Sequence, residues 1–483
     1  METNNRRLWT VDDLDEILDQ RADDRIFEEL GLAKIKETIT QDVQSNILKG
    51  VKHKYLLYCF FTFRKSRKLE IVDWLKNLPL TSTDKQIKDE AADSINLFLS
   101  FQGYEFFCDP RKIGYTLKLD DDILAFQEGL EQRCSTSFGK INEEELDPNY
   151  SKPSHALILL ASNDDVLKEC NEETEDDIRQ EKLLDYFEEK TKVITRDPRK
   201  THRYKKAFGK VFFEIGFRNP EGSDGPSREW FGFNDGISNP RFFSRYLPDG
   251  QGEPDKPSKL NTVLRRNSLA GDFACGSFVV FLKLEQDDEA FRKMVKELAK
   301  HLKMEDHRGQ VEAYIMGRYR DGTPLHSDFN FPNIREQKRN LNAFDFSNDK
   351  EGYNCPLHAH IRKANPRDGQ EDNLRIVRRG RVYGREGSGE KGILFLSYQN
   401  SLHQFEDIVN RGLYGYNYKK RRIGKDVLFV DKGDEREYHR YWNATGNTRT
   451  PYLRPEKLVK FRGGQYFFAS SISFIQKSLE RFI

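Results

Sequence analysis

Asp235 lies in the segment EWFGFNDGISNPRF, where one carboxylate is flanked by Trp230, Phe231, Phe233 and Ile237. Apolar neighbours favour the protonated form of a carboxyl group, which suits a residue that takes up and returns protons. Asn-Asp-Gly is also a common turn signal, so the triplet could serve the backbone alone. Asp235 is therefore a candidate for acid–base catalysis, with a turn as the alternative.

A second group of candidates lies in NCPLHAHIRKANPRD. Cys355, His358 and His360 could supply three zinc ligands, and a single neutral imidazole could instead bind haem iron. Two residues apart, the histidines share a face on a strand but diverge on a helix, so the spacing does not choose between them. Arg362 and Arg367 follow and could pair with carboxylates such as haem propionates.

A third group lies in NLRIVRRGRVYG. If this segment is a strand, its period of two places Arg378 with Ile376 on one face and Arg379 with Arg381 on the other. A guanidinium stays charged at any working pH, so a buried one could act as a fixed positive field. A run of charges is also typical of a solvated face.

The composition excludes several classes of protein. The chain has 483 residues, and its aromatic content of 12% argues that it is not disordered. Its 80 Lys and Arg are balanced by 79 Asp and Glu, which argues that it does not bind nucleic acid or an acidic membrane. None of the six cysteines forms CxxC or CxxCH, so covalent haem attachment is not expected. The first residues lack an apolar core for a signal peptide and no apolar run approaches ~20 residues, so we expect a cytoplasmic protein without a membrane segment.

Four segments pair an apolar strand with a charged amphipathic helix, and acidic or amide residues suited to N-caps lie between them. These segments are KYLLYCFFTF with a helix over Ser66–Leu78, HALILLAS with a helix from Asn163 to Lys190, GSFVVFLKLEQ with a helix capped near Gln286–Asp288, and GILFLSYQ with the helix of NSLHQFEDIV. Further strands are predicted over Ser94–Phe101, Lys210–Phe217 and Gln465–Ser470.

This order predicts an α+β fold of two ferredoxin-like halves, each an antiparallel sheet with helices packed on it. We place an N-terminal helical extension at residues 1–45, the first half at 46–240 and the second half at 241–483.

The candidate segments together resemble the dye-decolourising peroxidase family of haem enzymes, and the length favours its larger-chain subgroups. GFNDG is similar to the family's GxxDG, AHIRKANPR to its proximal histidine segment and RIVRRG to its distal arginine segment, while GILFLSYQ and GGQYFFASSIS are similar to its late strand and closing segment. The resemblance spans roughly residues 40–480 in the family's order.

The resemblance implies one non-covalent haem b per chain, bound in the second half. It implies His360 as the proximal iron ligand, Asp235 as the distal acid–base residue and Arg378 as the distal arginine. It further implies that a carboxylate, best matched by Asp426, binds the proximal histidine, and that the haem contacts Arg362, Ile393 and Phe395.

The implied activity is oxidation of bulky aromatic donors, such as dyes and phenols, by hydrogen peroxide through a ferryl intermediate. Tyr441 and Trp442 could relay electrons from donors too large for the haem pocket. The alternatives are a haem-binding protein for haem handling, iron release or sensing, a haem-free module on the same fold, and a zinc protein. The sequence indicates neither the physiological reductant nor the oligomeric state.

Overall fold

The structure is a computed structural model that describes most of the chain. The described residues are 9–21, 24–107, 121–134, 145–191, 207–219, 227–243, 257–267, 270–325, 341–342, 344–367, 375–387, 389–413, 417–418, 421–422, 425–429 and 457–482. Among them, no helix is both long and apolar enough to cross a membrane.

The first half contains a four-stranded antiparallel sheet with the strand order β2-β3-β1-β4. Its strands are β1 (Tyr55–Phe63), β2 (Ser94–Leu99), β3 (Ala156–Ser162) and β4 (Phe208–Phe217). In a ferredoxin-like unit the first and third strands lie at the centre with the fourth and second outside them. The observed order is that arrangement.

The second half repeats the pattern in the order β12-β6-β9-β8. Its strands are β6 (Cys275–Gln286), β7 (Val377–Arg378), β8 (Arg381–Tyr383), β9 (Gly392–Gln399) and β12 (Val459–Ala469), and β5 (Arg265–Arg266) pairs with the outer end of β6. A separate short hairpin joins β10 (Asn417–Tyr418) and β11 (Arg421–Arg422). The predicted α+β class with two ferredoxin-like halves is confirmed.

The two sheets join at both edges, where Phe468 of β12 pairs with Leu99 of β2 and Phe217 of β4 pairs with Val382 of β8. The sheet therefore closes into a ring with a packed interior. Along β1, Tyr58 and Phe60 face this interior, where the ring of Phe60 stacks on Phe212 at a centroid distance of 4.6 Å. The alternate residues face the helices, so both faces of the strand are buried, which explains its continuous apolar sequence.

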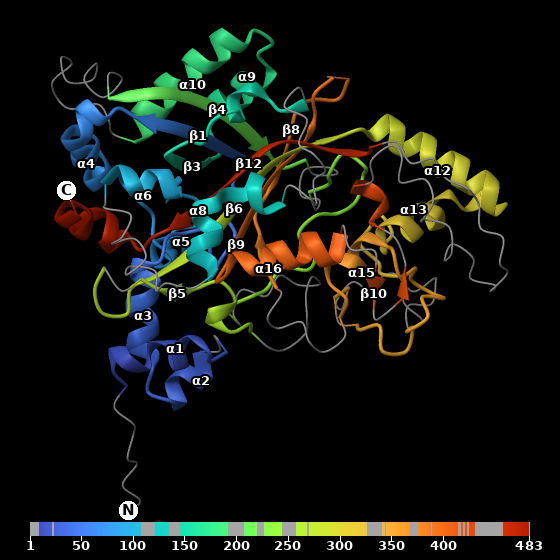
Figure 1. The fold of residues 1–483 in the computed structure, drawn as a ribbon, viewed down its shortest axis with the longest axis horizontal. Helices are drawn as coiled ribbons and strands as arrows, with labels where there is room; N and C mark the ends of the chain where they lie inside the picture. Colours follow the sequence, from blue (N-terminus) through green and yellow to red (C-terminus); the bar gives the residue numbers. More distant parts are fainter. Residues whose placement is uncertain are drawn as a thin grey trace, which may run out of the picture.

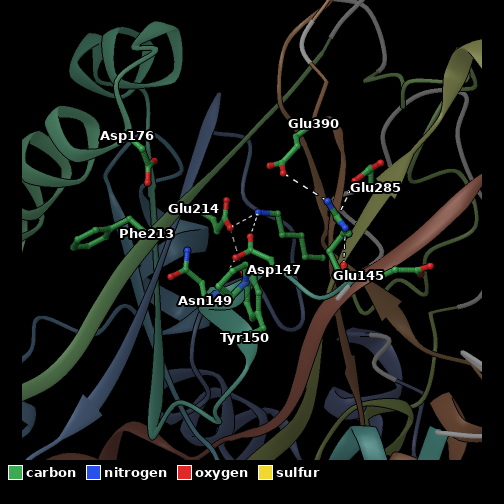
Figure 2. Close-up of polar contacts among 12 residues, drawn as sticks. Glu145, Asp147, Asn149, Tyr150, Asp176, Phe213, Glu214, Glu285 and Glu390 are labelled. Carbon is green, nitrogen blue, oxygen red and sulfur yellow. Dashed lines mark hydrogen bonds and ion pairs between the residues drawn. The ribbon is translucent and has the colours of Figure 1, made fainter. Parts of the chain in front are cut away.

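One end of the ring interior is polar. Lys283 of β6 donates hydrogen bonds to Asp147 at 2.6 Å and to Glu214 of β4 at 2.7 Å, and the hydroxyl of Tyr150 donates to Glu214 at 3.2 Å. Figure 2 shows Asp147, Glu214 and Tyr150 converging there. These contacts pair the buried ammonium with carboxylates and connect β6 of one half to β4 of the other.

Helices cover the outer faces of the ring, and three N-terminal helices pack together at one end of the molecule (Figure 1). The N-terminal helices are α1 (Leu14–Leu18), α2 (Asp24–Glu29) and α3 (Ala33–Asp42). The covering helices of the first half are α4 (Lys68–Asn77), α5 (Thr83–Lys88), α6 (Phe101–Phe107), α8 (Asp121–Cys134), α9 (Asp165–Glu172) and α10 (Asp176–Lys190). Those of the second half are α12 (Asp288–Leu302), α13 (Arg308–Met316), α15 (His360–Ala364) and α16 (Leu402–Asp407).

The helix predicted from Asn163 to Lys190 is instead two helices, α9 and α10. Glu173 leaves the helical region at φ −68° and ψ 131°, and its carboxylate accepts the backbone N–H groups of Thr174 and Glu175. The run EETEDD concentrates negative charge at the C-terminal end of α9, where the helix dipole disfavours it, and at the N-terminal end of α10, where the dipole favours it. The acidic run therefore ends one helix and begins the next.

Candidate active site

A cavity of about 440 Å³ lies on the helix-covered side of the second sheet. Its walls are mainly apolar and come from β6, β9, α13, α15 and α16, together with the segment that follows β4. Asp235, His360, Arg378, Ile393 and Phe395, which lie far apart in the sequence, all line it. Ile393 and Phe395 reach it because side chains of β9 alternate, so that Leu394 and Leu396 face the ring interior instead.

His360 is the first residue of α15, and its ring is 23% exposed where it lines the cavity. Its Nδ1 lies 2.6 Å from Oδ2 of Asp426, whose side chain is fully buried. The other oxygen of Asp426 accepts the backbone N–H of Leu428 at 3.0 Å. Because an ionised carboxylate only accepts hydrogen bonds, this contact favours the tautomer with its proton on Nδ1 and its lone pair on Nε2, which is the form that binds a metal.

His358 lies just before α15 and is buried away from the cavity lining. Burial lowers the pKa of His358 to about 3, so its imidazole is neutral. Among the residues that the structure describes, no group of three His, Cys, Asp or Glu side chains could hold a metal ion, so the zinc alternative with Cys355 gains no support. The start of a helix at His360 separates the two imidazoles that the spacing alone could not distinguish.

Arg362 is a correction to the sequence analysis, because it does not line the cavity. Its guanidinium is fully buried and donates to the carboxylate of Asp349 at 2.9 Å and to the carbonyl of Cys355 at 2.6 Å. Two residues after His360 on one helix, it projects about 200° away from the histidine. Arg362 therefore holds the segment before α15 and does not face a cavity ligand.

We expect Arg362→Ala to destabilise the protein by about 3–5 kcal/mol, because it leaves the buried Asp349 carboxylate without its ion pair. The midpoint of urea unfolding measures this loss. Arg320→Ala is the matched control, since Arg320 forms a two-point ion pair with Glu312 at the surface, where a loss of at most about 1 kcal/mol is expected. Weakened haem binding with unchanged stability would contradict the structural role.

Asp235 ends a hairpin-like turn that begins at Ser227. The backbone N–H of Asp235 donates to the carbonyl of Ser227 at 2.9 Å, and Arg228 bridges to Asn234. The N–H of Gly236 donates to Oδ1 of Asp235 at 2.6 Å, and Gly236 has a φ of 81° that favours glycine. The turn that the sequence indicated is thus present, and it places the Asp235 carboxylate on the cavity.

Glu229, which the sequence analysis did not select, is a second carboxylate on the cavity. Its oxygens accept the backbone N–H groups of Phe231 at 2.9 Å and Phe233 at 2.8 Å, so it holds the turn that carries Asp235. Burial raises the pKa of Glu229 to about 7, with a smaller contribution from the charge of Asp235. No sequence motif marked it, because its role depends on burial by residues distant in the chain.

This raised pKa gives a prediction for stability. A carboxyl group that is harder to ionise in the folded state contributes stability below its unfolded pKa of 4.5, and that contribution is lost as the pH rises through about 7. We therefore expect the unfolding temperature to fall less between pH 4.5 and pH 7 in Glu229→Gln than in the natural protein. Glu297→Gln, on the exposed face of α12, is the control and should keep the natural slope. Equal slopes in all three proteins would refute the prediction.

The predicted alternation around Arg378 is present. Ile376, Arg378 and Gly380 line the cavity. Arg379 and Arg381 point the other way, where they donate to the carbonyls of Asn46 and Val51 at 3.0 Å each. Arg378 therefore faces the cavity from β7, while Arg379 and Arg381 attach the segment before β1. Arg375, which precedes β7, also lines the cavity.

Two further buried arginines line the cavity, Arg318 and Arg367. Arg318 donates to Oγ of Ser238 at 3.2 Å and to Oδ1 of Asn342 at 3.1 Å, and Arg367 donates to the carbonyl of Asn342 at 2.7 Å. Burial lowers the pKa of Arg318 to about 9, and the positive charges of Arg367 and Arg378 add to this effect. With Arg375 and Arg378, four arginines thus line one cavity, an arrangement that an anionic ligand would stabilise. Arg318 was missed because only its folded position distinguishes it from other arginines.

Tyr441 and Trp442, the predicted electron relay, lie outside the described residues.

The chain is similar in sequence to known peroxidases. Residues 226–425 match the family model described as Dyp-type peroxidase, C-terminal. The chain is 25% identical over 494 residues to dye-decolorizing peroxidase msp1 of Mycetinis scorodonius, covering 91% of this chain and 87% of that relative. It is 29% identical to multifunctional dye peroxidase DyP2 of an Amycolatopsis species over 289 residues, covering 53% of this chain and 61% of that relative.

The fold gives the same result over more of the chain. The crystal structure of a DyP-type peroxidase from an Anabaena species superposes with a TM-score of 0.76 at 24% identity, covering 96% of this chain and 99% of that one. Residues 226–425 therefore match the Dyp-type peroxidase family in sequence, and 96% of the chain shares the fold of a solved Dyp-type peroxidase.

Proposed function

We propose that the protein is a haem peroxidase that uses hydrogen peroxide to oxidise bulky aromatic donors, such as dyes and phenols. One observation carries the proposal beyond similarity to known proteins: a single cavity brings together a carboxylate-bound imidazole (His360), a second carboxylate (Asp235) and a half-buried guanidinium (Arg378). A peroxidase needs these three kinds of group, namely an iron ligand, a proton carrier and a fixed positive charge.

The residues present fit a haem. The apolar walls suit a flat macrocycle, Nε2 of His360 suits its iron, and the guanidinium groups of Arg318 and Arg367 suit its carboxylates. Bound haem would supply the iron that reacts with peroxide and holds the oxidising equivalents. Because the chain contains no CxxCH, we propose non-covalent haem b, one per chain.

Asp235 would move the proton. Its Oδ1 is held by the N–H of Gly236, which leaves Oδ2 to take a proton from peroxide and return it to the departing oxygen. Arg378 would stabilise the negative charge that develops when the O–O bond breaks, and its position on a paired strand keeps that charge fixed. Asp426 would make His360 a stronger donor to iron by accepting its Nδ1 proton.

The proposed reductants are aromatic one-electron donors. A solved dye-decolorizing peroxidase with this fold is described in complex with 2,6-dimethoxyphenol, and the relatives are named for dyes. Phenols and dyes are therefore the first donors to test. A relay through Tyr441 and Trp442 stays a prediction.

The test is to reconstitute the purified protein with haem and to record its absorption spectrum before and after one equivalent of hydrogen peroxide. We expect a haem spectrum that peroxide changes rapidly and that a phenol or dye restores. Bound haem that peroxide leaves unchanged would favour the alternative of haem handling, iron release or sensing. Absence of haem uptake would refute both.

A further inference from the structure

Asn239 makes two reciprocal hydrogen bonds with the backbone of Arg378. Its Oδ1 accepts the N–H of Arg378 at 2.8 Å, and its Nδ2 donates to the carbonyl of Arg378 at 3.0 Å. One side-chain amide thus pairs with both the backbone N–H and the backbone carbonyl of Arg378. The two residues are 139 positions apart in the chain, so the contact exists only in the folded protein.

The position of Arg378 in the sheet explains why this pairing matters. Strand β7 is the last in the sheet order, and it pairs with β9 along one edge, where Arg378 lies opposite Ser397. Its backbone N–H and carbonyl point to the other edge, where a further strand would otherwise lie. The side-chain amide of Asn239 lies at that edge. It supplies the hydrogen-bond donor and acceptor that the backbone of a neighbouring strand would otherwise supply. The guanidinium of Arg379 also donates to this carbonyl, at 3.3 Å.

Asn239 is itself held in place. Pro240 follows it and restricts its backbone to extended conformations. Ser238, before it, donates to Oδ1 of Asn342 at 2.9 Å and accepts from Arg318 at 3.2 Å. Asp235 lies only four residues earlier, on the same short segment. Asn239 therefore links the segment that carries the carboxylate to the strand that carries the guanidinium.

We propose that Asn239 is a positioning residue that fixes the backbone of Arg378 relative to Asp235, and that the reaction with peroxide depends on this link. The inference rests on the proposed peroxidase function. Because a displacement of about 1 Å can cost a hundredfold in rate, removal of the link should slow the peroxide reaction by about tenfold to a hundredfold. The subsequent oxidation of a phenol, which does not need Arg378 to break a bond, should keep its rate.

The first test compares Asn239→Ala with Gln180→Ala in the haem-loaded protein. Gln180 of α10 makes the same reciprocal pair with the backbone of Phe213, at 2.9 and 3.1 Å, and neither residue lines the cavity. Stopped-flow absorbance gives the second-order rate constant with peroxide, and urea unfolding gives the stability. We expect similar losses of stability in both variants but a slower peroxide reaction in Asn239→Ala alone. Equal peroxide rates in the two variants would overturn the inference.

Two further measurements separate positioning from a general structural role. Hydrogen–deuterium exchange of the peptide that contains Arg378 should become faster in Asn239→Ala, because that N–H loses its acceptor. In an Arg378→Ala background, Asn239→Ala should have no further effect on the peroxide rate. The same fold loss in both backgrounds would show that Asn239 acts elsewhere and would refute the proposal.

If Asn239→Ala does not fold, Asn239→Asp replaces it, since this variant keeps the size and the acceptor of Asn239 but loses the donor. Its peroxide rate should then fall below the natural rate, and an unchanged rate would overturn the inference. A natural protein that binds haem but does not react with peroxide would instead refute the proposed function, so the two failures remain distinguishable.

Discussion

Asp235→Asn is expected to slow the reaction of the haem-loaded protein with hydrogen peroxide by about 10²- to 10⁴-fold, the range that general acid–base catalysis usually contributes. The substitution preserves shape, and its amide oxygen can still accept the N–H of Gly236. What it removes is an oxygen that can carry a proton to and from peroxide. Haem content should stay unchanged, because the groups proposed to hold the haem are elsewhere on the cavity. Stopped-flow absorbance measures the rate, and the haem band measures the content.

A matched control for this variant exists in the chain. Asp321 also precedes a glycine of positive φ, Gly322 at 93°, and its Oδ1 accepts the N–H of Thr323 at 2.9 Å, but Asp321 does not line the cavity. Asp321→Asn should therefore keep the natural peroxide rate. If Asp235→Asn keeps that rate as well, another group moves the proton, and Glu229 would be the next carboxylate to substitute.

Local patterns were sufficient to predict the strands and the direction of several side chains. The continuous apolar run of β1 indicated a buried strand, whereas Ile393 and Phe395 of β9 were expected at the site from the family resemblance. The period of two along a strand placed Arg378 opposite Arg379 and Arg381. The two sheet units were predicted because four of the strands were each followed by a charged helix.

Contacts between distant segments could not be predicted in the same way. Asn239 pairs with Arg378, and Arg318 meets Ser238, only after the two halves of the cavity wall have folded together. Arg362 was misassigned because the sequence did not show that a helix begins at His360 and turns the following arginine away. Glu229 resembled any other glutamate until its burial was known.

His360→Ala should abolish stable haem binding, because it removes the nitrogen proposed to bind the iron. The haem-free variant should stay folded, since the ring is 23% exposed to the cavity and little of the core depends on it. Titration with haem, followed at the haem absorption band, measures the affinity. His301→Ala, on the exposed face of α12, is the control and should bind haem normally. Unchanged haem affinity in His360→Ala would move the ligand to another residue.

A graded variant shows whether the carboxylate behind the histidine contributes as proposed. Asp426→Asn keeps the size of a fully buried side chain but replaces a charged acceptor with a neutral one. Loss of an outer partner of a metal ligand typically costs about 10- to 100-fold in affinity. We therefore expect haem affinity in the order natural protein, Asp426→Asn, His360→Ala. If Asp426 acts through its contact with His360, it should have no effect on haem affinity once His360 is alanine. A further loss in that double variant would show that Asp426 supports the fold of the cavity instead of the ligand.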